Sequence, residues 1–309
     1  MTPLRLGYLY GFGAYLIWGF FPLYLKLLRP AGPLEILAHR IVWSVVFVAL
    51  LLGALRNVGF LRALLRRPWA VAGIVTAAAL IAVNWGTYIY GVNSGRVVET
   101  ALGYFINPLV VVLLGVTVLR ERLRPLQWVA LGISGSAVVV LTVDYGHLPW
   151  LALTLAFSFA GYGLVKKRLG LPAAEGLFVE SAVLALPALG YLAWLTRRAE
   201  LTFGHVSAGH TALLVLAGAA TAIPLLLFAG AANRLPLTGL GMIQYLAPIL
   251  QLGCGVLIFH EPMPPARLAG FALVWLALGV FTADAVRHAR HNRARTRAAV
   301  TVEVPVPTP

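Results

Sequence analysis

Ten apolar segments of roughly twenty residues follow one another along the chain, and their length constrains the fold more than any other feature of the sequence. A helix of that length crosses the hydrocarbon core of a bilayer and satisfies its own backbone hydrogen bonds in lipid, whereas a β-barrel would show short strands of alternating polarity. The sequence therefore predicts an all-α membrane protein with ten transmembrane helices. These are expected at residues 5–27, 36–55, 70–92, 98–119, 126–143, 147–167, 176–195, 210–231, 237–259 and 266–286.

The composition agrees with a chain surrounded by lipid. Of its 309 residues, 60% are hydrophobic and only 11% are charged, and the mean hydropathy is +0.87. Soluble domains carry about 25% charged residues, so this chain lacks the polar side chains needed to cover a water-soluble globule. We therefore expect the lipid bilayer to be its main partner.

The chain also repeats itself at an offset of 140 residues, which predicts two domains, residues 5–143 and 147–286. Each copy holds five expected spans, an odd number, so the second copy enters the membrane from the opposite side. This is the arrangement of two inverted five-helix repeats, in which a binding site forms between the copies. The uncommon residues that match are Lys26 with Lys166, Glu35 with Glu175, Asn93 with Asn233, Pro108 with Pro248, Glu121 with Glu261, Pro125 with Pro265, and Asp144 with Asp284.

The distribution of positive charge predicts the orientation. If ten spans are counted, 17 Lys and Arg residues fall on the side that holds both termini and 6 on the other side. Because basic residues concentrate on the cytoplasmic side, both termini are expected in the cytoplasm, and the net charge of +14 requires no nucleic acid partner. Residues 287–309 turn basic and end in a Pro-rich stretch, which predicts a disordered basic cytoplasmic tail.

Several motifs resemble the RarD-type branch of the EamA family, in the drug/metabolite transporter superfamily. They are Gly13-Ala14-Tyr15-Leu16-Ile17-Trp18-Gly19, Pro33-Leu34-Glu35-Ile36-Leu37-Ala38-His39-Arg40, Asn84-Trp85 with Tyr88, Glu99-Thr100-Ala101-Leu102-Gly103-Tyr104-Phe105-Ile106-Asn107-Pro108, and Gln244-Tyr245 with Ala247-Pro248. The resemblance covers nearly all of residues 5–286. It implies ten helices in two halves, a central cavity, and carrier-type movement of a small molecule across a bacterial inner membrane.

Polar and aromatic residues at membrane depth are the candidates for substrate binding, because such groups are costly in lipid and usually face a cavity or the protein interior. They fall on helical stripes at i, i+3 and i+4 spacing. Walls of this kind suit an aromatic or amphipathic organic solute. The alternative is that the amides bond across helices and that the rings fill the core. The candidates are Tyr15, Trp18, Asn84, Trp85, Tyr88, Tyr104, Asn107, Gln244 and Gln251.

Arg40 and its repeat counterpart Glu180 are charged residues within expected spans. Arg40, about one turn inside its span, is a candidate for binding an anionic group, and Glu180 for carrying a coupling proton. Each could instead anchor a helix end or pair locally. Pro108 and Pro248 match between the copies and are candidate hinges, because proline frees a backbone carbonyl and bends a membrane helix.

These features favour a secondary transporter that works by alternating access. No phosphate-binding loop of the ATPase type occurs, and no metal-binding spacing or catalytic constellation appears, so we expect neither a cofactor nor an enzyme. The alternative is a membrane channel, or a non-transport membrane protein with a ligand cavity. Substrate identity, direction of transport and oligomeric state stay open.

Overall fold

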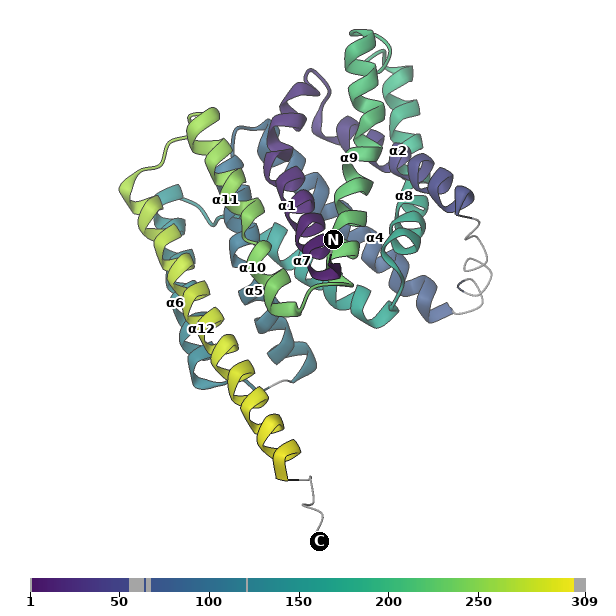
Figure 1. Ribbon diagram of the computed structural model, residues 1–309. Coiled ribbons are helices and arrows are strands. Elements are labelled where there is room, and N and C mark those ends of the chain that lie inside the picture. Colours follow the sequence, from purple (N-terminus) through teal and green to yellow (C-terminus); the bar gives the residue numbers. More distant parts are fainter. Residues whose placement is uncertain (1, 56–63, 65–67, 121, 303–309) are drawn as a thin grey trace. The chain divides into compact units, whose positions relative to one another are not determined.

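The computed structural model describes residues 2–55, 64, 68–120 and 122–302. In this part of the chain the regular structure is helical, without strands, which confirms the all-α prediction (Figure 1). The helices are α1 (Pro3–Leu27), α2 (Pro33–Ala54), α4 (Pro68–Asn93), α5 (Val97–Leu119), α6 (Pro125–Tyr145), α7 (Trp150–Leu169), α8 (Ala173–Arg197), α9 (Ala208–Ala232), α10 (Leu237–Ile243), α11 (Leu246–Gly253), the π-helical turn η1 (Cys254–Ile258) and α12 (Pro265–Val302).

Eight of the described helices are long and apolar enough to cross a membrane: α1, α2, α4, α5, α6, α8, α9 and the first part of α12. The expected span at 147–167 is helix α7, but it is less apolar than these eight. Its last turn holds Lys166, Lys167 and Arg168, which interact favourably with the carbonyl end of a helix but lower its hydropathy.

The span predicted as one helix at 237–259 is broken in the structure. Helix α10 ends at Ile243, α11 begins at Leu246, and the segment finishes in η1. Pro248 contributes to the break, because it has no N–H to bond the carbonyl of Gln244, four residues earlier, and its ring crowds that carbonyl. Pro108, its counterpart, leaves α5 continuous.

The basic segment that follows the last expected span begins as a continuation of helix α12. Helix α12 continues through Arg287 to Val302, and residues 303–309 lie outside the described part. Ala and Arg dominate residues 287–299. Both are strong helix formers, and extending an existing helix avoids the cost of nucleation, so the polar segment stays helical.

The chain divides into two compact units, the first comprising residues up to Val111 with Pro149–Met263, and the second Val112–Leu148 with the residues from Pro264 onward. Within the first unit, α2 packs against α8 and α9, α4 against α7, and α1 against α9 and α11. Helices α2 and α8 run antiparallel, because Ile41 lies near Ala188 while Leu52 lies near Leu177.

A glycine permits a close contact between α9 and α2 in this unit. A Cβ on Gly218 of α9 would lie 2.3 Å from the backbone of Trp43 on α2. Only a residue without a side chain allows the two backbones to approach this closely. The contact brings the middle of α9, with Thr221 one turn further on, against α2.

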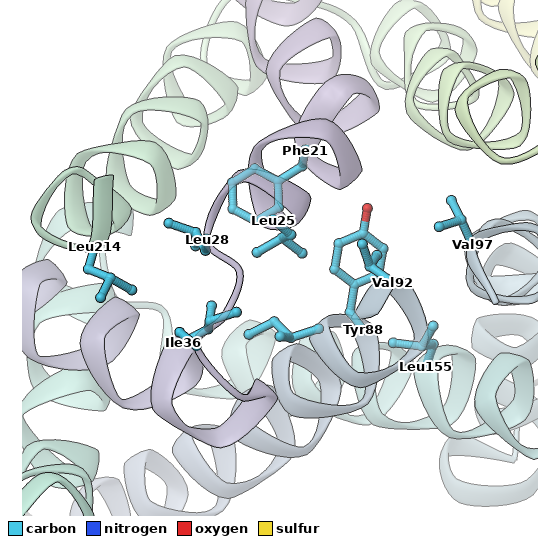
Figure 2. Packing of buried hydrophobic residues seen from close by; sticks show 11 residues of the cluster. Phe21, Leu25, Leu28, Ile36, Tyr88, Val92, Val97, Leu155 and Leu214 are labelled. Atoms are coloured by element: carbon cyan, nitrogen blue, oxygen red, sulfur yellow. The ribbon is translucent and has the colours of Figure 1, made fainter. Parts of the chain in front are cut away.

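The apolar core of the first unit lies where α1, α2 and α4 converge. Phe21, Leu25, Ile36, Tyr88 and Ile89 are buried together there. The rings of Phe21 and Tyr88 are neighbours in this core (Figure 2), and their centroids are 6.4 Å apart. The core thus places a phenol hydroxyl among apolar side chains.

In the second unit, α6 and α12 form a long antiparallel pair (Figure 1). Arg124, at the start of α6, forms an ion pair with Asp284, well along α12. At the other end, Nε of Arg267 lies 2.9 Å from Oδ2 of Asp144. The two matched aspartates therefore bind arginines at opposite ends of the pair.

Candidate functional site

The candidate site is centred on Arg40. Because α2 begins at Pro33 rather than near residue 36, Arg40 lies about 10 Å along the helix, two turns instead of one from its start. Its side chain is buried, and Nε donates a hydrogen bond to Oγ1 of Thr221 on α9, at 3.0 Å. None of the ion pairs among the described residues includes Arg40.

Two aromatic rings contact the guanidinium. Its central carbon lies 4.9 Å from the ring centroid of Phe21 and 4.6 Å from that of Trp85. A desolvated cation–π contact stabilises by about 2 kcal/mol, whereas removing an ion from water costs several kcal/mol. The aromatic rings therefore offset only part of the cost of burying this charge.

Tyrosines pack against the rings that contact this charge. The rings of Tyr24 and Tyr88 lie 5.5 and 6.4 Å from that of Phe21, centroid to centroid. The rings of Tyr88 and Tyr104 meet edge to face, with centroids 5.7 Å apart. Tyr24 donates its hydroxyl to the carbonyl of Leu213, at 2.6 Å. Tyr88 is 4% exposed, and its hydroxyl has no hydrogen-bond partner among the described residues.

Asn84 joins three helices through its amide. Its Nδ2 donates to the carbonyl of Leu155 and to Oγ of Ser158, both on α7, at 3.0 and 3.1 Å. Its Oδ1 accepts from the hydroxyl of Tyr104, at 3.3 Å. With both amide protons and the oxygen engaged, Asn84 is suited to holding the ring of Tyr104 in place.

Tyr15, Trp18 and Gln251 form a second group. The rings of Tyr15 and Trp18 lie 5.3 Å apart, and both contact Phe228 of α9. Nε2 of Gln251 donates to the carbonyl of Trp18, at 3.0 Å, which ties α11 to α1. Among the described residues, no hydrogen bond or ring contact joins this group to the Arg40 cluster, although α1 carries residues of both.

Asn107 and Gln244 are less tightly held. Oδ1 of Asn107 is buried without a hydrogen-bond partner among the described residues, as is Oε1 of Gln251. Gln244 is half-buried at the break between α10 and α11. Buried polar groups normally have partners, so unpartnered ones at predicted binding positions are consistent with contact to a solute or to water.

Glu180 differs from Arg40 because its charge is compensated. Its carboxylate accepts from Nζ of Lys166 at 2.8 Å and from the hydroxyl of Tyr162 at 3.0 Å. Both partners lie on α7, so Glu180 joins α8 to that helix. The structure places Glu180 and Arg40 in separate clusters.

Three other carboxylates of the first unit bind backbone N–H groups. Glu35 accepts from Thr202 and Phe203, Glu99 from Leu151, and Glu261 from Val97 and Val98. Carboxylates at these positions hold turns and helix starts. Glu121, the counterpart of Glu261, lies outside the described residues, as do Arg56, Arg62, Arg66 and Arg67 of the charge count.

The sequence-based prediction missed Phe21, Tyr24 and Thr221. Phe21 and Tyr24 continue the i, i+3 spacing of Trp18 along α1, so the stripe from Tyr15 could have been extended to them. Thr221 gave no comparable signal, because its role depends on the close approach of α9 to α2.

The comparisons with known proteins identify the class. The EamA-like transporter family matches the chain twice, over residues 5–143 and 149–283. The chain therefore belongs to the EamA-like transporter family and is a multi-pass membrane protein, which confirms the resemblance noted from its motifs.

Several relatives cover almost the whole chain. Protein RarD of Streptomyces exfoliatus is 55% identical over 98% of this chain and 96% of its own length. The uncharacterized transporter YojE of Bacillus subtilis is 44% identical over 93% of this chain and 97% of its own length. Protein RarD of Escherichia coli K12 is 38% identical over 91% of this chain and 95% of its own length. These relatives support a RarD-type membrane transporter and point away from an enzyme.

One solved crystal structure resembles the chain with a TM-score of 0.57, over 89% of this chain and 96% of the other. At 22% sequence identity, this likeness supports the fold alone.

Proposed function

We propose that the protein is a secondary carrier that moves a small organic molecule across the membrane by alternating access, with the Arg40 cluster as its binding site. The observation that carries this proposal is a buried guanidinium among aromatic rings, with no ion pair to another described residue. Ionisable groups at membrane depth are expensive, and they usually mark a solute pathway. Trp85, Tyr88 and Tyr104 would contact the solute, while Asn84 would position Tyr104.

Inverted repeats can give a carrier two similar conformations, one open to each side of the membrane, and the helix packing supports an inverted duplication. Under the 140-residue offset, α2 corresponds to α8 and α6 to α12, and the members of each pair pack antiparallel. Likewise, the packing of α1 against α9 corresponds to the packing of α7 against α4. Each packed pair of helices is thus matched by the pair at the offset positions, and the family model matches the chain twice. Two inverted repeats would produce both features.

The break between α10 and α11 is the candidate bending point. Gln244 lies at the break, one turn before Pro248, so a change in the bend would move its amide. Broken helices at membrane depth line solute sites in many transporters. Pro108 remains a candidate hinge within a helix that is continuous in this conformation.

A proton that couples transport through Glu180 would compete with Lys166 for the carboxylate. The ammonium 2.8 Å away stabilises the charged carboxylate in the present conformation. Coupling through Glu180 predicts that Glu180→Gln removes the response of transport to a pH gradient. An unchanged response would exclude Glu180 from the proton path.

The proposed location is the bacterial inner membrane, with both termini in the cytoplasm. The excess of basic residues on the side holding the termini supports this orientation. A fluorescent protein fused after Pro309 should fluoresce in cells, and alkaline phosphatase fused at the same position should be inactive. The reverse result would overturn the orientation.

The proposed function is tested with purified protein in proteoliposomes and a panel of radiolabelled organic acids, amides and amines. A carrier should give saturable uptake and exchange of a labelled solute against an unlabelled one. Single-channel conductance without saturation would indicate a channel, and the absence of any protein-dependent flux would overturn the proposal.

A further inference from the structure

We infer that the solute of the Arg40 cluster is an organic monocarboxylate with a flat apolar body, an inference that rests on the proposed function because it treats the cluster as the transport site. The guanidinium of Arg40 is a buried positive charge without a counter-ion among the described residues. A mobile carboxylate would supply that charge each time the solute binds.

Four carboxylates of the first unit that are not exposed are engaged elsewhere. Glu180 is paired with Lys166 on α7, and Glu99 binds Arg96 and the start of α7. Glu35 and Glu261 bind backbone N–H groups of other segments. The described chain thus holds Arg40 through neutral groups only, namely a threonine hydroxyl and aromatic rings.

The orientation of the guanidinium suits a carboxylate. Nε is bonded to Thr221, and rings of Phe21 and Trp85 lie within 5 Å of the guanidinium carbon. Nη1 and Nη2 of Arg40 form no hydrogen bond with the described residues. Two parallel N–H donors match the two oxygens of a carboxylate, a geometry that an ammonium ion does not offer.

Tyr88 supplies a further donor. Its buried hydroxyl is unpartnered among the described residues, and its ring packs against Phe21, which contacts the guanidinium of Arg40. A hydroxyl in this position would donate to a bound carboxylate. The rings of Tyr88, Tyr104 and Phe21 provide apolar faces against which a planar solute would pack.

The charged groups around Arg40 also limit the net charge of the solute. One uncompensated guanidinium balances a single negative charge, and a second would be buried unpaired. A solute ammonium would need an acceptor, but the buried carboxylates described above are already bonded. A monoanion is therefore favoured over a zwitterionic amino acid or an organic cation.

The test compares matched solutes by thermal shift of the full-length protein in detergent. The acids are benzoate, phenylacetate and indole-3-acetate, and the controls are their neutral amides, benzylamine and tryptophan. Wild-type protein should be stabilised by at least one acid at a concentration roughly tenfold or more below that of its amide. Stabilisation by the amides, benzylamine or tryptophan at equal or lower concentration overturns the inference, as does no response to any acid.

Variants assign the preference to the site. Arg40→Gln should remove the difference between acid and amide, Arg40→Lys should retain part of it, and Arg234→Gln, an exposed control, should keep all of it. Ligand-free Arg40→Gln should melt no lower than wild type, because it removes an uncompensated buried charge. Tyr88→Phe deletes only an unpartnered hydroxyl and should weaken acid binding severalfold. If Arg40→Gln does not fold, an unchanged acid preference in Tyr88→Phe overturns the inference.

Transport measurements show whether this inference or the proposed function has failed. Saturable uptake of a neutral or cationic solute that does not depend on Arg40 would retain the carrier but reject the monocarboxylate. Binding of acids that requires Arg40, without flux of any bound acid in proteoliposomes, would retain the ligand class but reject the carrier.

Discussion

Arg40 and Glu180 occupy matched positions 140 residues apart, yet only Glu180 has a counter-ion among the described residues, with Lys166 at 2.8 Å. Arg40 is held instead by Thr221 and two aromatic rings. At two positions related by the 140-residue offset, the protein thus carries an ion pair at Glu180 and an uncompensated charge at Arg40. This asymmetry is why the proposed binding site is assigned to the Arg40 cluster.

Replacing Trp85 with alanine should abolish ligand-dependent thermal stabilisation while leaving the folded yield largely intact. The change removes the ring 4.6 Å from the guanidinium of Arg40, and with it a wall of the proposed site. Trp194→Ala is the control, since its ring also contacts an arginine, Arg198, but is exposed on α8. Equal ligand responses in the two variants would reject the site assignment. Tyr104→Ala should behave as Trp85→Ala does.

Breaking the ion pair of α7 and α8 should destabilise the protein. Lys166→Met leaves the Glu180 carboxylate buried without its cation, which costs about 3 kcal/mol, at the low end of the range for buried pairs because Lys166 is 20% exposed. Lys166→Met with Glu180→Leu should recover most of that loss. Denaturant unfolding of the single and double variants gives the coupling free energy, and additive effects would show that the pair does not interact.

Adding a methyl group to Gly218 should separate α9 from α2. The new Cβ would lie 2.3 Å from the backbone of Trp43, so one helix must move, at a cost of about 1–3 kcal/mol. A Cβ on Gly190 of α8 meets no heavy atom within 4 Å, so Gly190→Ala should be neutral or slightly stabilising. The melting temperatures of the two variants test this contact. A Gly218→Ala protein as stable as Gly190→Ala would contradict it.

Replacing Pro248 with alanine should let α10 and α11 join. The restored N–H can bond the carbonyl of Gln244, so the variant should gain thermal stability and lose transport rate. Pro108→Ala should change stability less, because α5 is already continuous at that position. Initial rates of uptake in proteoliposomes, compared at equal protein density, decide whether the break is needed. Wild-type rates in Pro248→Ala would remove its hinge role.

The sequence by itself determined the all-helical membrane class, the positions of most helices and the family. These follow from segment length, hydropathy and local motifs, and such properties act over short distances along the chain. It also identified Arg40, Trp85, Tyr88 and Tyr104 as candidates. Pro248 was predicted as a hinge, but the break at Gln244 was not predicted. Proline bends some membrane helices and leaves others continuous.

Only the tertiary structure decided which candidates meet. Asn84 was predicted to bind a solute, but its amide is fully engaged by α7 and Tyr104. The sequence left open whether Arg40 and Glu180 pair locally, and Lys166 and Thr221 distinguish them only after α7 and α9 pack beside α8 and α2. Compensation of a buried charge depends on side chains that lie far apart in the sequence, so helix packing determined it and hydropathy did not.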